Sequence, residues 1–443
     1  MTEKLVESEK LEVSDLSDWF RAGIKPEKDW GIGTEHEQFL LKAGDLTRLR
    51  YNSRPGIREI LSEGAENGWL PIIEKGNIIA LQKDGASITI EPAGQFELSG
   101  SKLETVHETY KETIEYTQKL EEMAAKMGFV RLPIGFDPFW RREDLDWMPK
   151  ERYSYMRAWM PGKGNLGLDM MSRTSSIQVN LDFSSEADMV RKMQVAQAFQ
   201  PVITALFANS PFTERQPNGY LSYRSHVWDD TDPDRCGFLP FIFGDNFGFE
   251  RYTQYLLDVP LYFIFRDGVY YPADGMTFRD FMKGKHHFQP SMADWETHVT
   301  TVFPDVRLKR YIELRGADSG SPAMIVALAA FWVGLLYDTQ ALDAAHSLAL
   351  HLGIDTIIGL RAEVPVKGLR AESNSVVLHE LAAKLLSFAQ DGLARRALKC
   401  SIEPEQKYLE PLNEIVSTGI TSAEKWLNLY YNKWNRDISK LIE

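Results

Sequence analysis

Polar residues, glutamates among them, recur at alternate positions in several short segments of this 443-residue chain. In the stretch GIGTEHEQFL, Glu35 and Glu37 flank one histidine inside an otherwise apolar run. A buried carboxylate is costly in free energy unless a positive group compensates it. The pair therefore predicts a cationic partner, either a metal ion or a basic side chain.

Three further segments carry polar residues with the same spacing of two. Side chains at i and i+2 of a β-strand point to one face, so each segment predicts a strand with a polar stripe. In SITIEPAGQFELSG, Pro92 and Gly94 also predict a bulge. The stripes are Glu91, Gln95 and Glu97; Ser176, Gln178, Asn180 and Asp182; and Arg307, Lys309, Tyr311, Glu313 and Arg315.

Such stripes are typical of the solvated face of an antiparallel sheet, or of carboxylates that converge on a cation. The ligands would be hard oxygens, which favour Mg²⁺ over zinc, and no DxDxDG calcium loop is present. Mg²⁺ commonly accompanies phosphates. The chain has no GxxxxGK[ST] motif and no GxGxxG opening a helix, so a nucleotide would need another mode of binding.

Basic residues interleave with aromatic ones between Trp140 and Asn165. This segment fits an RNA-binding patch, a loop that closes over nucleotide phosphates, or a surface loop with ordinary ion pairs. The net charge of −13 disfavours a nucleic-acid partner. The stretch GYLSYRSHVWDDTDPDRCG adds Arg224, His226 and Arg235. A guanidinium suits a planar carboxylate, so one of these residues could bind an amino-acid substrate.

Helical segments are expected around these strands. One runs from a Ser101 cap to Gly128, one starts at Ser184 or Ser185 with a kink at Pro201, and one covers Ala323 to Leu352. The 15-residue apolar run Ala323–Tyr337 is shorter than the ~20 residues of a membrane span, so we expect a buried helix and no membrane partner. After Arg361 we expect helices with breaks near Pro404 and Gly419.

The cellular location is predicted from the cysteines and the N-terminus. Cys236 and Cys400 cannot build a disulfide framework, which fits a reducing cytosol. The segment MTEKLVESEK lacks the apolar core of a signal peptide. We therefore expect a cytoplasmic protein.

The motifs GTEHEQF, EPAGQFELSG, WRREDLDWMPKERY, QVNLDFSSEADM, PNGYLSYRSHVWDDTD and VRLKRYIELRGAD together resemble the plant and proteobacterial type of glutamate–cysteine ligase. The resemblance extends from about Trp30 to Asp338. It implies an α+β fold like that of glutamine synthetase, in which a curved, mainly antiparallel sheet forms a funnel with helices outside. It further implies a catalytic domain over 1–360 and a helical C-terminal region over 361–443.

The resemblance also implies an activity. Members of the family use MgATP to phosphorylate the γ-carboxylate of L-glutamate, and the amine of L-cysteine then attacks the acyl phosphate, in the first step of glutathione biosynthesis. The expected partners are these small molecules, and the chain is expected to be a monomer or a homodimer. A γ-glutamyl ligase with another amine acceptor, a guanidinium-transfer or other phosphotransferase, and a binding protein with a vestigial site remain as alternatives.

Carried over residue by residue, the resemblance implies roles for the polar stripes. Arg315 would contact the transferred phosphoryl group, and Arg224 is the expected contact to a substrate carboxylate. Gln178 and Asn180 would lie at the metal and nucleotide. The implied magnesium ligands are Glu35, Glu37, Glu91, Glu97 and Glu313.

Two departures from the family pattern bear on the function. The family shows Gly-Gly-Pro-Trp-Arg-Arg after RGAD, whereas this chain has Ser319–Met324 in the order SGSPAM. This change leaves the acceptor amine open. The segments YPADGMTF and HHFQPSMAD lack the regulatory cysteines of plant members, so redox control through them is not expected.

Overall fold

A nine-stranded sheet with antiparallel pairing organises the computed structural model, which describes residues 10–442. The prediction for the N-terminal segment therefore lies largely outside the described residues. The strand order is β14-β15-β7-β1-β5-β4-β3-β2, with β6 also paired to β1. The mixed α+β class is confirmed. The strands are β1 (Ile32–Lys42), β2 (Leu70–Glu74), β3 (Asn77–Lys83), β4 (Ala86–Ile90), β5 (Phe96–Ser99), β6 (Phe129–Leu132), β7 (Ser176–Leu181), β14 (Val306–Leu308) and β15 (Ile312–Asp318).

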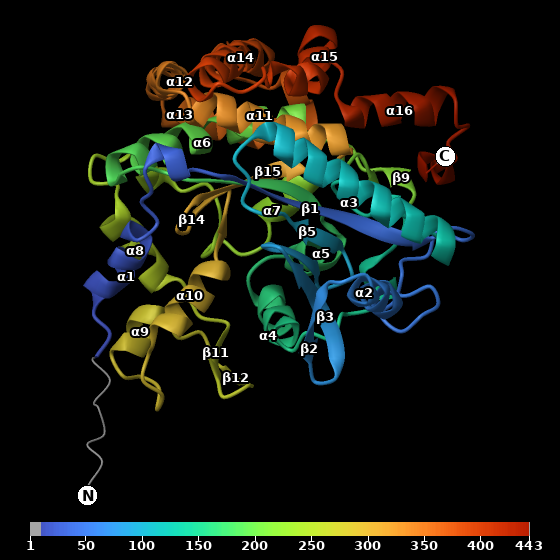
Figure 1. Cartoon of the computed structure of the whole chain (residues 1–443), viewed down its shortest axis with the longest axis horizontal. Helices are drawn as coiled ribbons and strands as arrows, with labels where there is room; N and C mark the ends of the chain where they lie inside the picture. The colour runs from blue at the N-terminus through green and yellow to red at the C-terminus, as the bar shows by residue number, and fades with distance from the viewer. Residues whose placement is uncertain (1–9, 443) are drawn as a thin grey trace, which may run out of the picture.

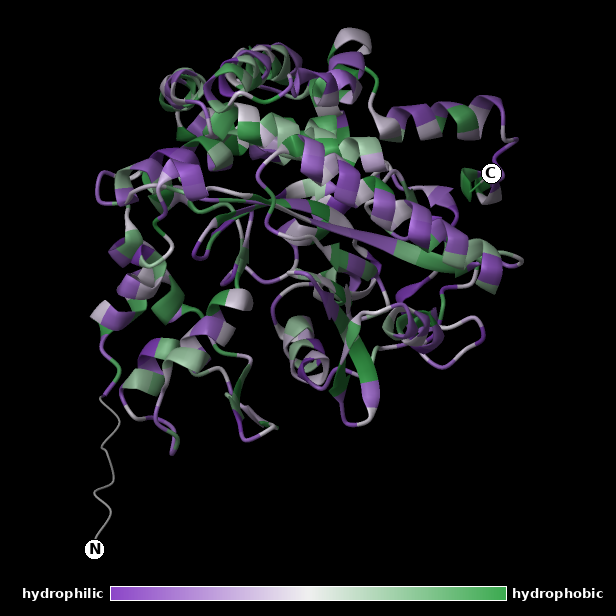
Figure 2. Ribbon diagram, in the orientation of Figure 1, coloured by the Kyte–Doolittle hydropathy of each residue, from purple (hydrophilic) through white to green (hydrophobic). Residues whose placement is uncertain are grey.

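Long helices gather on one side of this sheet (Figure 1). The hydropathy colouring shows that α11 is apolar along its length, whereas α3 mixes apolar and polar residues (Figure 2). This difference fits a helix enclosed on all sides and a helix with one solvated face. The helices are α3 (Val106–Met127), α6 (Glu186–Leu206), α11 (Pro322–Leu336), α12 (Thr339–Leu352), α13 (Ile354–Lys367), α14 (Leu378–Cys400), α15 (Glu410–Thr418) and α16 (Ser422–Asn432).

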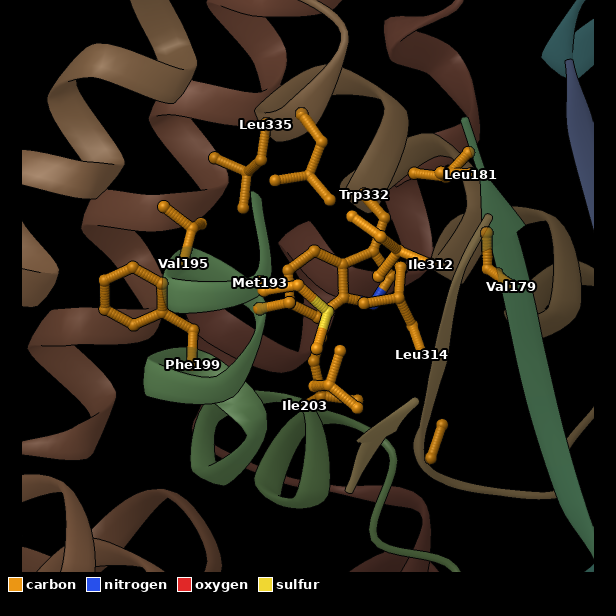
Figure 3. Packing of buried hydrophobic residues seen from close by; sticks show 14 of the residues in the cluster. Val179, Leu181, Met193, Val195, Phe199, Ile203, Ile312, Leu314, Trp332 and Leu335 are labelled. Carbon is orange, nitrogen blue, oxygen red and sulfur yellow. The ribbon is translucent and has the colours of Figure 1, made fainter. Parts of the chain in front are cut away.

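The largest core lies between the sheet and these helices. Apolar side chains of β7 and β15 point toward α6 and α11, and Trp332 of α11 fills the space between them (Figure 3). Because side chains alternate along a strand, the polar residues of β7 and β15 face the opposite side of the sheet. The core thus fixes which face of the sheet carries the polar stripes.

Helix α11 is enclosed further by α14. A Cβ added to Gly334 of α11 would lie 2.3 Å from the Ala389 carbonyl oxygen, and one added to Gly392 would lie 2.0 Å from the Gly334 carbonyl oxygen. The two backbones therefore cross in direct contact, which requires glycine at both positions.

The opposite side of the sheet carries shorter elements (Figure 1). They include 3-10 turns and hairpins such as β11 (Phe263–Arg266) with β12 (Val269–Pro272). The helices here and at the sheet edges are α1 (Val13–Arg21), α2 (Ile57–Glu66), α4 (Arg152–Trp159), α5 (Gly167–Arg173), α7 (Tyr223–Asp229), α8 (Phe249–Asp258), α9 (Phe278–Met282) and α10 (Met292–Thr300).

One of the predicted helix boundaries, the start of α3, differs from the structure. Helix α3 begins at Val106, not after Ser101, because Thr105 forms the capping box with Glu108. Its predicted end at Gly128 is confirmed by a left-handed φ of 79°. Helix α6 is capped by Ser185, as predicted, and contains Pro201.

The single helix predicted from Ala323 to Leu352 is two helices. α11 and α12 meet at an angle of 88°. Asp338 breaks the run, because its side chain accepts a hydrogen bond from the Ala341 N–H at 2.8 Å and caps α12. In residues 10–442 no single helix has the length and apolarity needed to cross a membrane, although this bent pair reaches the threshold by length and composition when both helices are taken together.

The helical C-terminal region contains the expected breaks. α14 ends at Cys400 shortly before Pro404, and α15 ends at Thr418, directly before Gly419, which has a φ of 68°. A short hairpin of β16 (Glu372–Ser373) and β17 (Val376–Val377) interrupts the helices. Helix α13 crosses the predicted boundary at residue 360 and α14 packs on α11, so the division into 1–360 and 361–443 stays a prediction about sequence regions.

Candidate active site

A cavity of about 560 Å³ lies on the polar face of the sheet, away from the long helices. Strands β1, β5, β7, β14 and β15 supply its polar wall, and α4, the β11–β12 hairpin and the start of β13 (Phe303–Pro304) supply much of its apolar wall. Its charged and amide lining consists of Glu35, Glu37, Glu91, Gln95, Glu97, Arg152, Gln178, Glu296, Arg307 and Arg315.

Strand register brings the predicted stripes together. Glu37 pairs with Glu97 across β1 and β5, and Glu35 pairs with Gln178 across β1 and β7. Residues directly opposite on neighbouring strands have Cβ atoms about 5 Å apart. Glu35, Glu37, Glu97 and Gln178 therefore form one polar surface, although they are far apart in the sequence.

His36 lies on the other face of β1, as the alternation predicts. Its ring packs edge-on against Tyr116 of α3, with ring centroids 5.3 Å apart. Burial, aided by Arg131, lowers the pKa of His36 to about 3. This histidine is therefore neutral and belongs to the core.

The segment predicted as a bulged strand is a hairpin. Glu91 follows the last residue of β4, and its N–H donates to the Gln95 carbonyl oxygen at 2.9 Å. Gly94 has a φ of 81° within the turn. The turn places Glu91 next to Glu97 at the cavity wall. The rule that residues at i and i+2 share a face does not hold across the turn, so it did not predict this placement.

Two carboxylates of this wall, Glu37 and Glu97, have raised pKa values. Burial and then Glu91 raise the pKa of Glu37 to about 7, against the opposing effect of Arg224. Burial, followed by Glu91, Glu35 and Glu37, raises the pKa of Glu97 well above its ordinary value. A bound cation would relieve this repulsion. The chemistry of the donors, carboxylate oxygens with neighbouring amides, fits Mg²⁺.

Glu313 has the opposite surroundings. It is fully buried, and its oxygens accept from Arg307 Nε at 2.5 Å, Lys309 Nζ at 2.9 Å and Arg315 Nη1 at 3.0 Å. Burial alone would raise the pKa of Glu313, but Arg307, Lys309 and Arg315 hold it well below its ordinary value. Glu313 does not border the cavity, so the arrangement gives no support to its predicted role as a metal ligand.

The two amides predicted at the nucleotide differ in position. Gln178 borders the cavity and accepts from Arg315 Nη1 at 2.6 Å. Asn180 donates through Nδ2 to Glu35 Oε1 at 2.7 Å, and its Oδ1 is buried without a partner among the described residues. Asn180 therefore acts on the cavity through Glu35.

The two predicted arginines are neighbours. Arg315 borders the main cavity. Arg224 lies behind it, donates through Nη2 to the Arg315 carbonyl oxygen at 3.0 Å, and borders a small adjoining cavity of about 30 Å³. Burial lowers the pKa of Arg224, although Asp318 and Glu37 oppose the shift. Trp228 borders both spaces.

The aromatic-rich segment 140–160 supplies part of the cavity cover through α4. Arg152, Tyr153 and Met156 border the cavity. Tyr155 Oη donates to the Tyr270 carbonyl oxygen at 2.8 Å and so joins α4 to β12. Arg152, one of the basic residues of the segment 140–165, and Arg307, in the stripe 307–315, were given no site role from the sequence. For Arg307 a signal was available in its place near Glu313, which it opposes across β14 and β15.

The glutamates do not form a closed metal cage by themselves. Within residues 10–442, no three Asp, Glu, His or Cys side chains are grouped closely enough to hold a metal ion. Mg²⁺ is often bound by one or two carboxylates together with substrate phosphates and water. An open wall of four glutamates is compatible with that mode and leaves space for a phosphate chain.

Comparisons with known proteins agree with this architecture. The family model described as glutamate-cysteine ligase family 2 matches residues 31–443. The chain is 46% identical to glutamate–cysteine ligase B, chloroplastic, of Oryza sativa subsp. japonica, over 100% of this chain and 89% of the relative. It is 48% identical to the chloroplastic glutamate–cysteine ligase of Arabidopsis thaliana, over 100% of this chain and 84% of the relative.

A solved structure shares the fold at low sequence identity. The glutamate–cysteine ligase of Francisella tularensis, solved in complex with AMP, aligns with a TM-score of 0.52 at 12% identity, over 93% of this chain and 87% of that one. At this identity the likeness concerns the fold alone.

These relatives also correct one prediction and establish the family. The expectation of a cytoplasmic location is contradicted, because the plant relatives in this comparison are named as chloroplastic enzymes. Low cysteine content was a poor guide, since it reports redox conditions and not a particular compartment. The match over residues 31–443 and the identities of 46% and 48% show that this chain belongs to the glutamate–cysteine ligase family 2.

Proposed function

We propose that this ligase joins the γ-carboxylate of L-glutamate to the amine of L-cysteine with MgATP as co-substrate, in the first step of glutathione biosynthesis. The observation that carries the proposal is the cavity in which four glutamates face Arg152, Arg307 and Arg315. The names of the plant relatives support the substrates. The AMP complex of the Francisella tularensis enzyme supports a nucleotide.

The acidic wall would hold the metal. Glu35, Glu37, Glu91 and Glu97 are the proposed ligands, and Asn180 orients Glu35 through the hydrogen bond of 2.7 Å. When bound, Mg²⁺ supplies positive charge against the phosphate oxygens of the nucleotide.

The chain's own residues position the reactants. Arg315 is oriented by Gln178 and Glu313 and is proposed to contact the transferred phosphoryl group. Such a contact stabilises the charge that develops during transfer. Arg224 is proposed to bind the glutamate carboxylate, since its Nε is buried without a partner among the described residues. The apolar wall excludes water, which would hydrolyse an acyl phosphate.

A second candidate is a γ-glutamyl ligase with another amine acceptor. It is favoured by the departure at Ser319–Met324. In the structure this run does not border the cavity, and Ser319 Oγ donates to the Glu37 carbonyl oxygen at 2.6 Å. The departure therefore lies behind β1, and the support for a changed acceptor is indirect.

Product analysis separates the candidates. The enzyme is incubated with MgATP, L-glutamate and an equimolar panel of amines that includes L-cysteine, and products are identified by mass spectrometry with phosphate release measured in parallel. γ-Glutamylcysteine with one phosphate per product is expected, and Glu35→Gln should abolish it without unfolding the protein. A different γ-glutamyl amide as main product would establish the second candidate, and ADP without any amide would refute both.

A further inference from the structure

Helix α7 carries two residues of the site region, Arg224 and Trp228, on only seven residues. A helix of this length is not stable by its own hydrogen bonds, so its position depends on contacts with the rest of the molecule. The neighbour that makes these contacts at both ends is α13, from the C-terminal half of the helical layer.

At the start of α7, α13 accepts two backbone hydrogen bonds. The Pro365 carbonyl oxygen accepts from the N–H groups of Leu221 at 2.8 Å and Ser222 at 3.0 Å. Ser222 is the N-cap of α7, and its Oγ donates to Asp318 Oδ1 at 2.9 Å. The entry to α7 is thereby attached to α13 and to β15.

At the end of α7, α13 forms an ion pair. Arg361 Nη1 lies 2.7 Å from Asp229 Oδ1, the last residue of α7. Arg361 and Pro365 are four residues apart and therefore lie on one face of α13. One turn of α13 thus contacts both ends of α7.

The same guanidinium extends to the strands of the site. Arg361 Nε lies 2.7 Å from Asp305 Oδ2, and Nη2 lies 3.3 Å from Asp305 Oδ1. The Asp305 carbonyl oxygen accepts from the Arg315 N–H at 3.3 Å. Arg361 therefore joins α7, which carries Arg224, to the segment that fixes the backbone of Arg315.

We propose that Arg361 is a positioning residue for the ligase reaction, which acts by holding α7 against β15 so that Arg224 and Arg315 keep their relative placement. For its effect on turnover the proposal rests on the proposed function. A guanidinium suits this role because its planar fork bonds two carboxylates at once, whereas an ammonium is a point charge. Small displacements of a positioned group reduce turnover strongly, by about 100-fold for 1 Å.

The test compares four variants of the full chain with the wild type: Arg361→Ala, Arg361→Lys, Asp229→Ala and the double variant Arg361→Ala/Asp229→Ala. Lys367→Ala is the matched control, because Lys367 is also on α13 and its ion pair with Glu363 is largely exposed and remote from the cavity lining. Two readouts are taken: kcat and KM for glutamate, cysteine and ATP, and amide hydrogen exchange over residues 221–229 and 106–127.

For Arg361→Ala we expect kcat/KM for glutamate to fall about 10- to 100-fold, and exchange over 221–229 to rise at least about tenfold while 106–127 is unchanged. Asp229→Ala should reproduce part of the fall in kcat/KM. In the double variant, the fold-decrease in kcat/KM should be smaller than the product of the fold-decreases in the two single variants. Arg361→Lys should be intermediate, and Lys367→Ala should match the wild type within about twofold.

Two results would overturn the inference. One is unchanged exchange over 221–229 in Arg361→Ala, which would show that α7 does not depend on Arg361. The other is an equal rise over 106–127, which would show a general loss of stability. If the wild type forms no γ-glutamyl product, the proposed function fails, but the exchange data still decide whether Arg361 holds α7.

Discussion

Two buried glutamates, Glu97 and Glu313, have opposite electrostatic surroundings on the same sheet. Glu97 lies among three other carboxylates, and Glu313 lies among three cations. Removing the negative charge should therefore have opposite effects on stability at the two positions. Glu97 therefore lacks a cationic partner that a bound metal ion would supply, whereas Glu313 is already paired with basic side chains.

In metal-free protein at pH 8, Glu97→Gln should raise the free energy of unfolding by about 1–3 kcal/mol, because it removes a carboxylate whose pKa is raised. Glu313→Gln should lower it by about 3–5 kcal/mol, because Arg307, Lys309 and Arg315 lose their counter-charge. Denaturant titration measures both, with Glu115→Gln on the exposed side of α3 as control. A shift of the same sign in both variants would contradict the assignment.

Glu37 should make metal binding depend on pH. Its pKa of about 7 exceeds the ordinary value of 4.5, so between these two pH values the folded metal-free protein holds a proton that the unfolded chain releases. The contribution of this group to stability is thus present below about pH 4.5 and is lost as pH rises toward 7. Mg²⁺ must displace the proton, so its affinity should rise between pH 6 and pH 8.

Calorimetric titration with Mg²⁺ and a non-hydrolysable ATP analogue, in two buffers of different ionisation enthalpy, measures the released proton. Glu37→Gln is the control and should bind more weakly with a smaller pH dependence. Equal affinity of the wild type at pH 6 and pH 8 would show that Glu37 does not compete for a proton at the metal.

At the scale of elements, the cover of the cavity consists of α4 and the β11–β12 hairpin. Tyr155 joins them through its hydrogen bond to Tyr270 and its edge-on contact with Phe263, with centroids 5.9 Å apart. Deleting the whole segment 140–160 would remove Tyr153 and Met160 from the core, so a point substitution is the cleaner test.

Tyr155→Ala should admit water and uncouple the reaction. We expect phosphate release to exceed γ-glutamyl product by at least about threefold, while the wild type releases one phosphate per product. Parallel assays of phosphate and product measure the ratio, and Tyr110→Ala, an exposed tyrosine on α3, serves as control. A ratio of one in Tyr155→Ala would refute the role of this cover.

Local rules account for much of the site but not for all of its elements. The faces of β1, β7 and β15 follow from alternation, because the direction of a side chain in a strand depends only on its own backbone. The placement of Glu91 does not follow from alternation, because the alternation of faces along a strand does not continue through a turn. The right-angle bend at Asp338 was missed because apolar content continues across it, although the Asp338 cap was a usable signal.

The ion pairs of Glu313 were also beyond sequence reasoning. The stripe Arg307, Lys309, Tyr311, Glu313 and Arg315 was predicted to lie on one strand, and this was wrong, because the chain turns at 309–311 between β14 and β15. Whether this glutamate binds a metal ion or its own basic neighbours depends on the antiparallel return of β14 onto β15, which places Arg307 opposite it. Pairing between strands is a tertiary property, and spacing along one strand does not determine it.

For the whole molecule, the two cysteines predict insensitivity to redox conditions. Burial raises the pKa of Cys236 to about 12, so its thiol is unreactive near neutral pH, and Cys400 is exposed. Activity after incubation with oxidised or reduced glutathione should differ by less than about twofold, with Cys400→Ser as control for disulfides between chains. A larger change that persists in Cys400→Ser would contradict this prediction.

The crossing of α11 and α14 at Gly334 and Gly392 has a consequence during protein synthesis. A ribosome releases α11 well before α14, so an apolar helix emerges with one of its long sides uncovered. Until residues 378–400 follow, that side is available to chaperones or to other nascent chains. A premature stop between the two helices would therefore yield an aggregation-prone fragment, even though every strand of the catalytic sheet had already been translated.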